Sequence, residues 1–275
     1  MKESNRIVST HNPLIKAARK LHDASGRREA GSFLIEGARL VAEAYTAGLT
    51  IERVFFLSEI VSRSREYTVL QQADQNQTPL IEVSHQVLEI ISQTVSPQGI
   101  VAWVKQPVYQ DDLHLTKGMR LLVADRIQDP GNLGTMIRLA RAFALDALVL
   151  VNGGADPWSD KVVRASAGAI FALKVLEWSQ ERLVTQLSKF EIPLIVTAPD
   201  SDLPVWKADL SATWALVIGN ESQGVIKSLR QNASYSVNIP MPGGTESLNA
   251  AMVSAIVLYE SIRQKNVDRF EEKRE

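Results

Sequence analysis

The sequence predicts an α/β protein whose mainly parallel sheet carries helices on both faces and is preceded by a smaller α/β domain. From Met119 onward, short apolar runs alternate with helical segments, which is typical of parallel strands joined by helices. A chain of 275 residues with 45% hydrophobic content can build two cores. A polar stretch separates the two patterns. We therefore expect a small domain over 1–106, a linker over 107–118, a sheet domain over 119–267 and a charged tail over 268–275.

A basic helix is predicted close to the amino terminus. Asn12 is suited to cap it and Pro13 to begin it, with Leu14, Ala18 and Leu21 along one face. The first 40 residues hold eight Lys or Arg against four Asp or Glu, although the net charge of the whole chain is -1. This asymmetry favours contact with nucleic acid or another polyanion, while a solvated helix face is the alternative. The candidate cations are Lys16, Arg19, Lys20, Arg27 and Arg28.

The rest of the first domain has the pattern of a small α/β unit. Its expected elements are an apolar segment at 33–37, a helix over 38–47, and strands at 54–57, 80–83 and 99–104. In the second domain, strands are expected at 121–124, 147–151, 173–176, 194–197, 215–218 and 235–239. Ligands of open parallel sheets bind at the carboxyl ends of the strands, so the loops after these strands are the places to look for a site.

The first such loop follows Ala124 and leads through Asp129 and Pro130 into a helix. Asn132 and Arg138 lie six residues apart, and we expect both to face the same end of the sheet. The alternative is a capped helix with an outward arginine. An asparagine placed in a loop at the end of a strand favours a functional role.

The second loop, Gly219-Asn-Glu-Ser-Gln-Gly224, directly follows a strand. Its two glycines have the spacing of a phosphate-binding P-loop, but Val225 and Ile226 stand where that motif needs Lys and Ser or Thr. The chain also has no GxGxxG fingerprint. Both observations disfavour the usual nucleotide folds. Glu221 is either a cap of the next helix or a site residue.

The third loop lies within 237–260, where a strand passes through a proline and the pair Gly243-Gly244 into a long helix. We expect Ser247 or Thr245 to cap this helix, and the polar turn 247–249 to form its first turn, where free N–H groups favour an anion. The alternative is an ordinary loop before a core helix. That helix would bury Ala250, Ala251, Val253, Ile256, Val257 and Tyr259 on one face.

Composition restricts the chemistry. The chain has 0 Cys, which excludes disulfides, thiolate metal sites and a cysteine nucleophile and is consistent with a cytoplasmic protein. All four histidines precede the sheet domain, so its reactions must depend on Arg, Glu, Ser and Asn. No metal is expected. The amino terminus has no signal-peptide core and no stretch is long enough to span a membrane, so we expect a soluble protein.

Together the three loops resemble the motifs of the SpoU (TrmH-like) RNA ribose 2'-O-methyltransferases of the SPOUT superfamily. The first motif is similar to 125–140, the second to 216–224 and the third to 239–249 with its continuation to Glu260. The amino-terminal part is similar, more loosely, to the small substrate-binding domain that many members carry. Its segments Phe33–Gly37 and Pro97–Gly99 carry that similarity.

This resemblance implies an S-adenosylmethionine-dependent transfer of a methyl group to a ribose 2'-hydroxyl of rRNA or tRNA. It also implies a carboxyl-terminal trefoil knot, although general experience runs against knots, and a homodimer whose active site combines both subunits. The implied cofactor-binding residues are Thr197, Gly219, Ile239, Met241 and Leu248. The implied catalytic residues are Arg138, Asn132, Glu221, Ser247 and Asn249. The alternative function is that of a non-catalytic RNA-binding or ribosome-assembly factor on the same fold.

Overall fold

The computed structural model describes residues 6–62, 64–109, 115–116, 118–245 and 247–271, which form two compact units. The first unit holds the described residues up to Val108 together with Trp158–Arg164, and the second holds the remainder. Part of the expected linker (110–114 and 117) and the end of the expected tail (272–275) lie outside the described residues. Among the described residues, no helix has the length and apolarity needed to cross a membrane.

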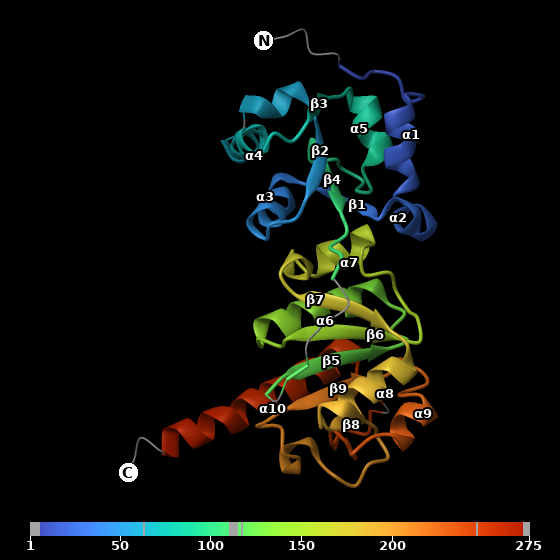
Figure 1. Ribbon diagram of the computed structural model, residues 1–275, viewed down its shortest axis with the longest axis vertical. Helices are drawn as coiled ribbons and strands as arrows, with labels where there is room; N and C mark the ends of the chain where they lie inside the picture. Colours follow the sequence, from blue (N-terminus) through green and yellow to red (C-terminus); the bar gives the residue numbers. More distant parts are fainter. Residues whose placement is uncertain (1–5, 63, 110–114, 117, 246, 272–275) are drawn as a thin grey trace. The chain divides into compact units, whose positions relative to one another are not determined.

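The first unit is built on a four-stranded sheet in the order β1-β4-β2-β3 (Figure 1). Strand β4 lies antiparallel between β1 and β2, and β3 runs parallel to β2 at the edge. The strands are β1 (Ser32–Glu36), β2 (Ile51–Phe56), β3 (Leu80–Glu82) and β4 (Ile100–Lys105). The helices are α1 (Pro13–Lys20), α2 (Ala24–Ala30), α3 (Ala38–Thr46), α4 (Ser64–Gln75) and α5 (His85–Ile91), with the 3-10 turn η1 (Ser58–Ser62).

Helix α1 begins as its sequence predicts. The Asn12 side chain accepts a hydrogen bond from the N–H of Leu14 at 2.9 Å, and Pro13 occupies the first turn. Of the predicted face, Ala18 and Leu21 are buried as expected and Leu14 is only half-buried, while Ile15 is buried in addition.

The two segments that resemble the substrate-binding domain meet at Glu36. Its buried carboxylate accepts hydrogen bonds from the hydroxyls of Ser92 and Thr94 and from the backbone N–H of Gln98, at 2.6 to 2.8 Å. Gly37 lies beside Gln98 so closely that a Cβ there would come within 2.3 Å of the glutamine side chain. These contacts fix the 92–98 loop against β1.

The second unit contains a six-stranded, wholly parallel sheet in the order β10-β8-β9-β5-β6-β7. Its strands are β5 (Arg120–Asp125), β6 (Ala147–Val151), β7 (Lys174–Trp178), β8 (Leu194–Thr197), β9 (Trp214–Ile218) and β10 (Tyr235–Val237). Its helices are α6 (Pro130–Ala142), α7 (Asp160–Ala165), α8 (Gln180–Lys189), α9 (Lys227–Gln231) and α10 (Ala250–Glu271), with the 3-10 turns η2 (Ala169–Phe171) and η3 (Val205–Lys207). The predicted parallel sheet is thus confirmed.

Helices cover both faces of this sheet. Alternate strand residues such as Val123 and Val217 form one core with Leu183 and Leu187 of α8 and Leu229 of α9. Helices α6 and α10 pack against each other, and α10 also contacts β9. All six strands are parallel, so the loops that follow their carboxyl ends lie at one edge of the sheet, where ligands of such sheets bind.

The loop 198–213 between β8 and β9 is joined to two later parts of the chain. The N–H of Val205 donates to the carbonyl of Asn238 at 2.8 Å, and the N–H of Leu210 donates to the side chain of Gln264 in α10 at 2.8 Å. This path is consistent with the trefoil knot that the family resemblance implies. The knot itself stays a prediction.

The sequence did not predict that most of helix α7 belongs to the first unit. The segment Trp158–Arg164 groups with the first unit, although it lies far along the chain in the sheet domain. The ring of Trp158 packs on Phe33, with their centroids 4.9 Å apart.

Candidate active site

A cavity of about 590 Å³ opens where β8, β9 and β10 end. Its wall comes from the loops after these strands and from the first turn of α10. All the residues predicted to bind the methyl donor line it, namely Thr197, Gly219, Ile239, Met241 and Leu248. Ser247 and Glu221, predicted as catalytic residues, also line it.

The loop after β9 closes into a tight turn. The side chain of Asn220 accepts hydrogen bonds from the N–H groups of Ser222 and Gln223 at 3.0 Å, and its carbonyl accepts one from Gly224 at 2.8 Å. Gly224 has φ +65°, which favours glycine. A Cβ on Gly219 would lie 2.2 Å from the carbonyl carbon of Gly224. The two glycines are therefore required by the turn itself, which then presents its backbone to the cavity.

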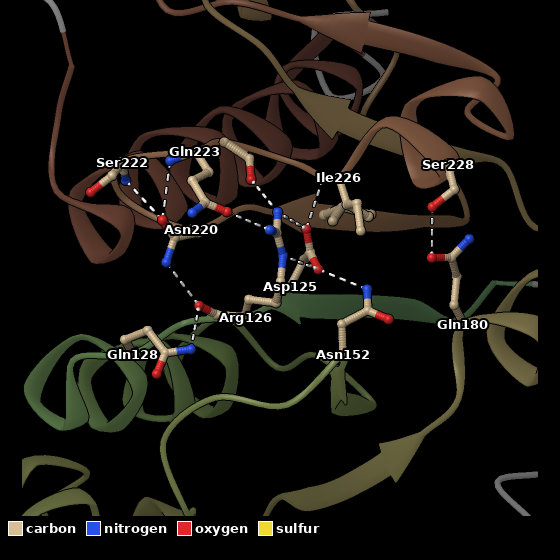
Figure 2. A network of polar contacts seen from close by, with 12 residues as sticks. Asp125, Arg126, Gln128, Asn152, Gln180, Asn220, Ser222, Gln223, Ile226 and Ser228 are labelled. Atoms are coloured by element: carbon tan, nitrogen blue, oxygen red, sulfur yellow. Dashed lines mark hydrogen bonds and ion pairs between the residues drawn. The ribbon is translucent and has the colours of Figure 1, made fainter.

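Asp125, at the end of β5, anchors this turn (Figure 2). Its carboxylate is fully buried and accepts hydrogen bonds from the N–H of Ile226 at 2.9 Å and from the Asn152 side chain at 2.8 Å. Arg126 completes the set with two contacts of 3.2 Å to the same carboxylate. Because a buried carboxylate is costly unless it is paired and hydrogen-bonded, this arrangement fixes three loop ends relative to one another.

Arg126 extends the same network toward the cavity. Its guanidinium donates to the Gln223 side chain at 2.7 Å and to the Gly224 carbonyl at 3.0 Å, while its own carbonyl accepts from Asn220 at 3.1 Å. Its φ of +56° is uncommon for a residue with a side chain. The contacts on both sides of Arg126 hold this conformation, and they brace the turn that lines the cavity.

Three of the predicted catalytic residues form a chain of hydrogen bonds. The amide N of Asn132 donates to the Glu221 carboxylate at 2.7 Å, and the amide O of Asn132 accepts from Asn249 at 2.5 Å. Asp129 caps α6 by accepting from the N–H of Asn132 at 2.7 Å, which holds this residue at the start of the helix. Residues from three loops thus converge beside the cavity, as the sequence predicted.

Arg138 does not join this chain. It is exposed on α6, does not line the cavity, and has no hydrogen-bond or ion-pair partner among the described residues. Within one subunit Asn132 and Arg138 share no hydrogen-bond partner among the described residues, and the expectation that they act together stays a prediction. Six residues along an α-helix correspond to about 600°, which places the two side chains about 120° apart around the axis.

The third loop differs from the prediction in its cap. Asn249, rather than Ser247 or Thr245, caps α10, because its side-chain oxygen accepts from the N–H groups of Ala251 at 2.8 Å and Met252 at 3.3 Å. The 247–249 turn therefore precedes the helix. Of the two loop glycines, only Gly244 has a positive φ, at +75°.

Helix α10 exposes two side chains that were expected in the core. Ile256 and Tyr259 are 37% and 64% exposed, as is Met252 at 59%, whereas Val257 and Leu258 are buried. The exposed residues are spaced by four and three positions, so they form one apolar stripe along the helix. A periodic apolar pattern alone could not distinguish a face that meets the sheet from one that meets water or a partner.

The amino-terminal cations divide into two kinds. Lys16, Arg19, Lys20 and Arg28 are exposed, as binding to RNA would require. Arg27 is a correction, because it is 5% exposed and donates to the carbonyl groups of Leu21 and His22 at 2.8 and 2.7 Å. Its guanidinium therefore stabilises the turn between α1 and α2 by binding backbone carbonyls there.

The cavity fits S-adenosylmethionine. Apolar side chains such as Ile218 and Val237 line it beside the exposed backbone of the 219–224 turn, which suits a nucleoside. The amide oxygen of Asn238 is buried without a hydrogen-bond partner among the described residues, and Asn238 lines the same cavity. A buried acceptor without a partner can accept a hydrogen bond from an N–H or O–H group of a bound molecule. Within the described residues, no group of three or more His, Cys, Asp or Glu side chains is arranged to hold a metal.

Sequence reasoning missed the bracing role of Asp125 and Arg126 and the positions of Asn238 and Arg230 at the cavity. An acidic residue at the end of an apolar strand and an asparagine within one were the available signals for Asp125 and Asn238. Arg230 lies on a short helix with no pattern that marks it.

Comparison with known proteins assigns the family. The sequence model of the SpoU rRNA Methylase family matches residues 119–259, and that of the MRM3-like substrate binding domain matches residues 12–102. A curated relative, the 23S rRNA (guanosine(2553)-2'-O)-methyltransferase RlmP of Bacillus subtilis, is 32% identical and aligns over 92% of this chain and 98% of its own length.

Solved structures agree with this assignment. An RNA 2'-O ribose methyltransferase superposes with a TM-score of 0.81 at 32% identity, over 94% of this chain and 99% of the other. The AdoMet-bound rRNA methyltransferase from Sinorhizobium meliloti superposes with a TM-score of 0.85 at 29% identity, over 95% and 98% of the two chains. From its three motifs, its parallel sheet and these matches, the chain belongs to the SpoU rRNA Methylase family.

Proposed function

We propose that this protein transfers the methyl group of S-adenosylmethionine to a ribose 2'-hydroxyl of ribosomal RNA. The observation that carries the proposal is the hydrogen-bonded chain Glu221–Asn132–Asn249 beside a cavity that fits the methyl donor. A factor that only bound RNA would have no need for this polar chain at a donor-sized cavity. Relatives named as rRNA 2'-O-methyltransferases support the same activity.

S-adenosylmethionine, when bound, supplies a methyl group that is activated by its attachment to a positively charged sulfur. The residues predicted to bind it would hold the donor mainly through backbone around Gly219 and Leu248. The polar chain with Glu221 orients the ribose, so that the hydroxyl lies in line with the methyl group. Positioning of this kind supplies a large part of the rate when two reactants must meet in one geometry.

Arg138 is the proposed electrostatic catalyst. A ribose hydroxyl is a poor nucleophile at neutral pH, and an arginine normally remains protonated, so Arg138 is suited to stabilise the developing alkoxide rather than to remove its proton. Because it is exposed and away from the cavity of its own subunit, we propose that it acts at the partner's site in a homodimer.

The apolar stripe of Met252, Ile256 and Tyr259 on α10 supports the homodimer. An exposed apolar stripe on a helix is stabilised when another protein surface covers it. In a two-fold symmetric dimer with its axis beside α10, the stripe of one subunit would pack against the same stripe of the other. Since α10 packs against α6, such a dimer also brings Arg138 near the shared face.

Ribosomal RNA is the proposed substrate, and tRNA is the second candidate. The exposed cations Lys16, Arg19 and Lys20 lie on α1 and Arg28 lies on α2, in the unit matched by a substrate-binding domain, and they would contact phosphates. We place this activity in the cytoplasm, consistent with a chain that contains 0 Cys.

The test of substrate is a map of 2'-O-methylated positions in total RNA from cells with and without the gene for this protein. We expect methylation to disappear at one rRNA position and to return when the wild-type protein is supplied. Loss at a tRNA position would replace the substrate, and an unchanged map would contradict the proposed function.

A further inference from the structure

Arg230 is a positively charged residue that lines the cavity. Among the described residues that line it, the charged side chains are Glu221 and Arg230, so Arg230 is its one cation. The methyl donor carries one anionic group, the carboxylate of its methionine part. An apolar and backbone-lined cavity that accepts this molecule needs a partner for that charge, because a carboxylate taken out of water is costly when unpaired.

The guanidinium of Arg230 has hydrogen-bonding capacity to spare. Its Nη2 donates to both carboxylate oxygens of Asp200, at 2.8 and 2.7 Å. Its Nε and Nη1 have no partner among the residues that the structure describes. A guanidinium presents five N–H donors in one plane, so Nε and Nη1, on either side of the Nη2 contact, each keep an N–H group that can donate a hydrogen bond to a second carboxylate.

Asp200 sets the orientation of this guanidinium. The hydrogen bond from Arg230 lowers the pKa of the Asp200 carboxyl, as expected for a carboxylate that accepts from a guanidinium. The two side chains are 40% and 65% exposed, so their ion pair contributes little to folding. Arg230 lies on α9 and lines the cavity, and its contact with Asp200 restricts the orientation of its guanidinium.

We propose that Arg230, oriented by Asp200, binds the carboxylate of the methyl donor and so selects donors that carry this group. The proposal rests on the proposed function, because it assumes that S-adenosylmethionine occupies the cavity. It adds a specificity-determining residue to a site where donor binding was expected to depend mainly on backbone.

Calorimetric titration tests the proposal with two ligands, S-adenosylmethionine and decarboxylated S-adenosylmethionine, which differ only in this carboxylate. Arg230→Gln should weaken binding of S-adenosylmethionine about tenfold, as expected for loss of one partly exposed charge-assisted contact. Its affinity for the decarboxylated ligand should change less than about twofold. Lys227→Gln, which removes an exposed cation from the same helix α9 without touching the cavity, should leave both affinities unchanged.

Asp200→Asn distinguishes a role of Arg230 in donor binding from a role in the ion pair with Asp200. It removes the ion pair but keeps the guanidinium, so this variant should still prefer the donor that carries a carboxylate. If Arg230→Gln weakens both ligands equally, or if Asp200→Asn matches it, Arg230 has only a structural role and the proposal fails. The proposal also fails if Arg230→Gln lowers RNA affinity alone. Absence of S-adenosylmethionine binding by the wild-type protein would instead contradict the proposed function.

Discussion

Arg138 carries a permanent positive charge on an exposed turn of α6, and no described residue pairs with it. In a folded protein such a cation is usually a solvated surface residue. Its agreement with a family motif and its place on the helix that begins with Asn132 give it a different interpretation, that of a group held ready for a site completed by a second subunit. The two interpretations predict different kinetics.

We predict that Arg138→Ala folds and binds S-adenosylmethionine normally but loses turnover by a factor on the order of 10². The reason is that Arg138 is proposed to interact with the negative charge that develops on the ribose oxygen only in the transition state. Arg141→Ala, an exposed arginine one turn further along α6, is the matched control and should keep the wild-type rate. Single-turnover methylation by the two variants measures the difference. Equal rates for both would remove Arg138 from the chemistry.

A mixed dimer tests the placement of Arg138 across the subunits. Arg138→Ala combined with a donor-site variant, Gly219→Val, should recover part of the activity, because one intact site can form in the mixed dimer. Activity no greater than that of the two variants measured separately would place Arg138 in its own subunit's site.

At the scale of elements, the turn after β9 depends on its own backbone geometry. Donor approach to bare backbone explains Gly219 from sequence, but the structure gives a nearer cause, since a side chain at this position meets Gly224 within the turn. At Gly243 a Cβ meets nothing within 4 Å. A side chain at Gly219 is therefore expected to disturb the fold more than one at Gly243.

We predict that Gly219→Ala weakens S-adenosylmethionine binding at least tenfold, because the added Cβ displaces the turn that lines the cavity. Gly243→Ala, its matched control, should bind within about twofold of the wild type. Calorimetric titration measures both affinities. Comparable losses in the two variants would show that the donor approaches the backbone at Gly243 as well.

At the scale of the whole molecule, the apolar stripe on α10 and the basic surface around α1 make separate predictions. Ile256→Glu introduces a charge into the stripe and should convert a dimer into a monomer, which sedimentation velocity at micromolar concentration would measure. Glu66→Gln, a charge change on α4 in the first unit, serves as control. A monomeric wild-type protein would contradict the dimer, and an unchanged dimer in the variant would place the interface elsewhere.

The basic surface is tested by the dependence of RNA affinity on salt. Replacing Lys16 and Lys20 by Gln should weaken binding to rRNA fragments. It should also reduce the slope of log K against log salt by roughly 1 to 2, because a protein that makes fewer phosphate contacts displaces fewer counterions when it binds. Arg27 is unsuited to this test, since its guanidinium is buried. An unchanged slope would make the cations a solvated helix face.

Much of the architecture follows from sequence because it depends on local patterns. Each predicted strand of the parallel sheet has its counterpart, since short apolar runs between helices leave few alternatives. The convergence of Asn132, Glu221 and Asn249 also follows, because parallel strands bring their carboxyl-end loops to one edge.

Other features depend on which surfaces meet, and a single sequence does not contain that information in local form. The burial of Arg27, the exposure of Ile256 and the grouping of Trp158 with the first unit all arise from tertiary packing. The cap at Asn249 was misassigned because Thr245, Ser247 and Asn249 are all suitable caps, and only the path of the loop selects one.

The central claim is that the methyl group goes to a ribose 2'-hydroxyl, and the most direct measurement follows the label. Purified protein, S-adenosylmethionine with a labelled methyl group and rRNA are incubated together, and the RNA is then hydrolysed completely with alkali. A 2'-O-methyl group blocks cleavage at its nucleotide, so the account predicts label in alkali-resistant dinucleotides, and almost none with Arg138→Ala. Label recovered in mononucleotides would mean methylation of a base and would contradict the account.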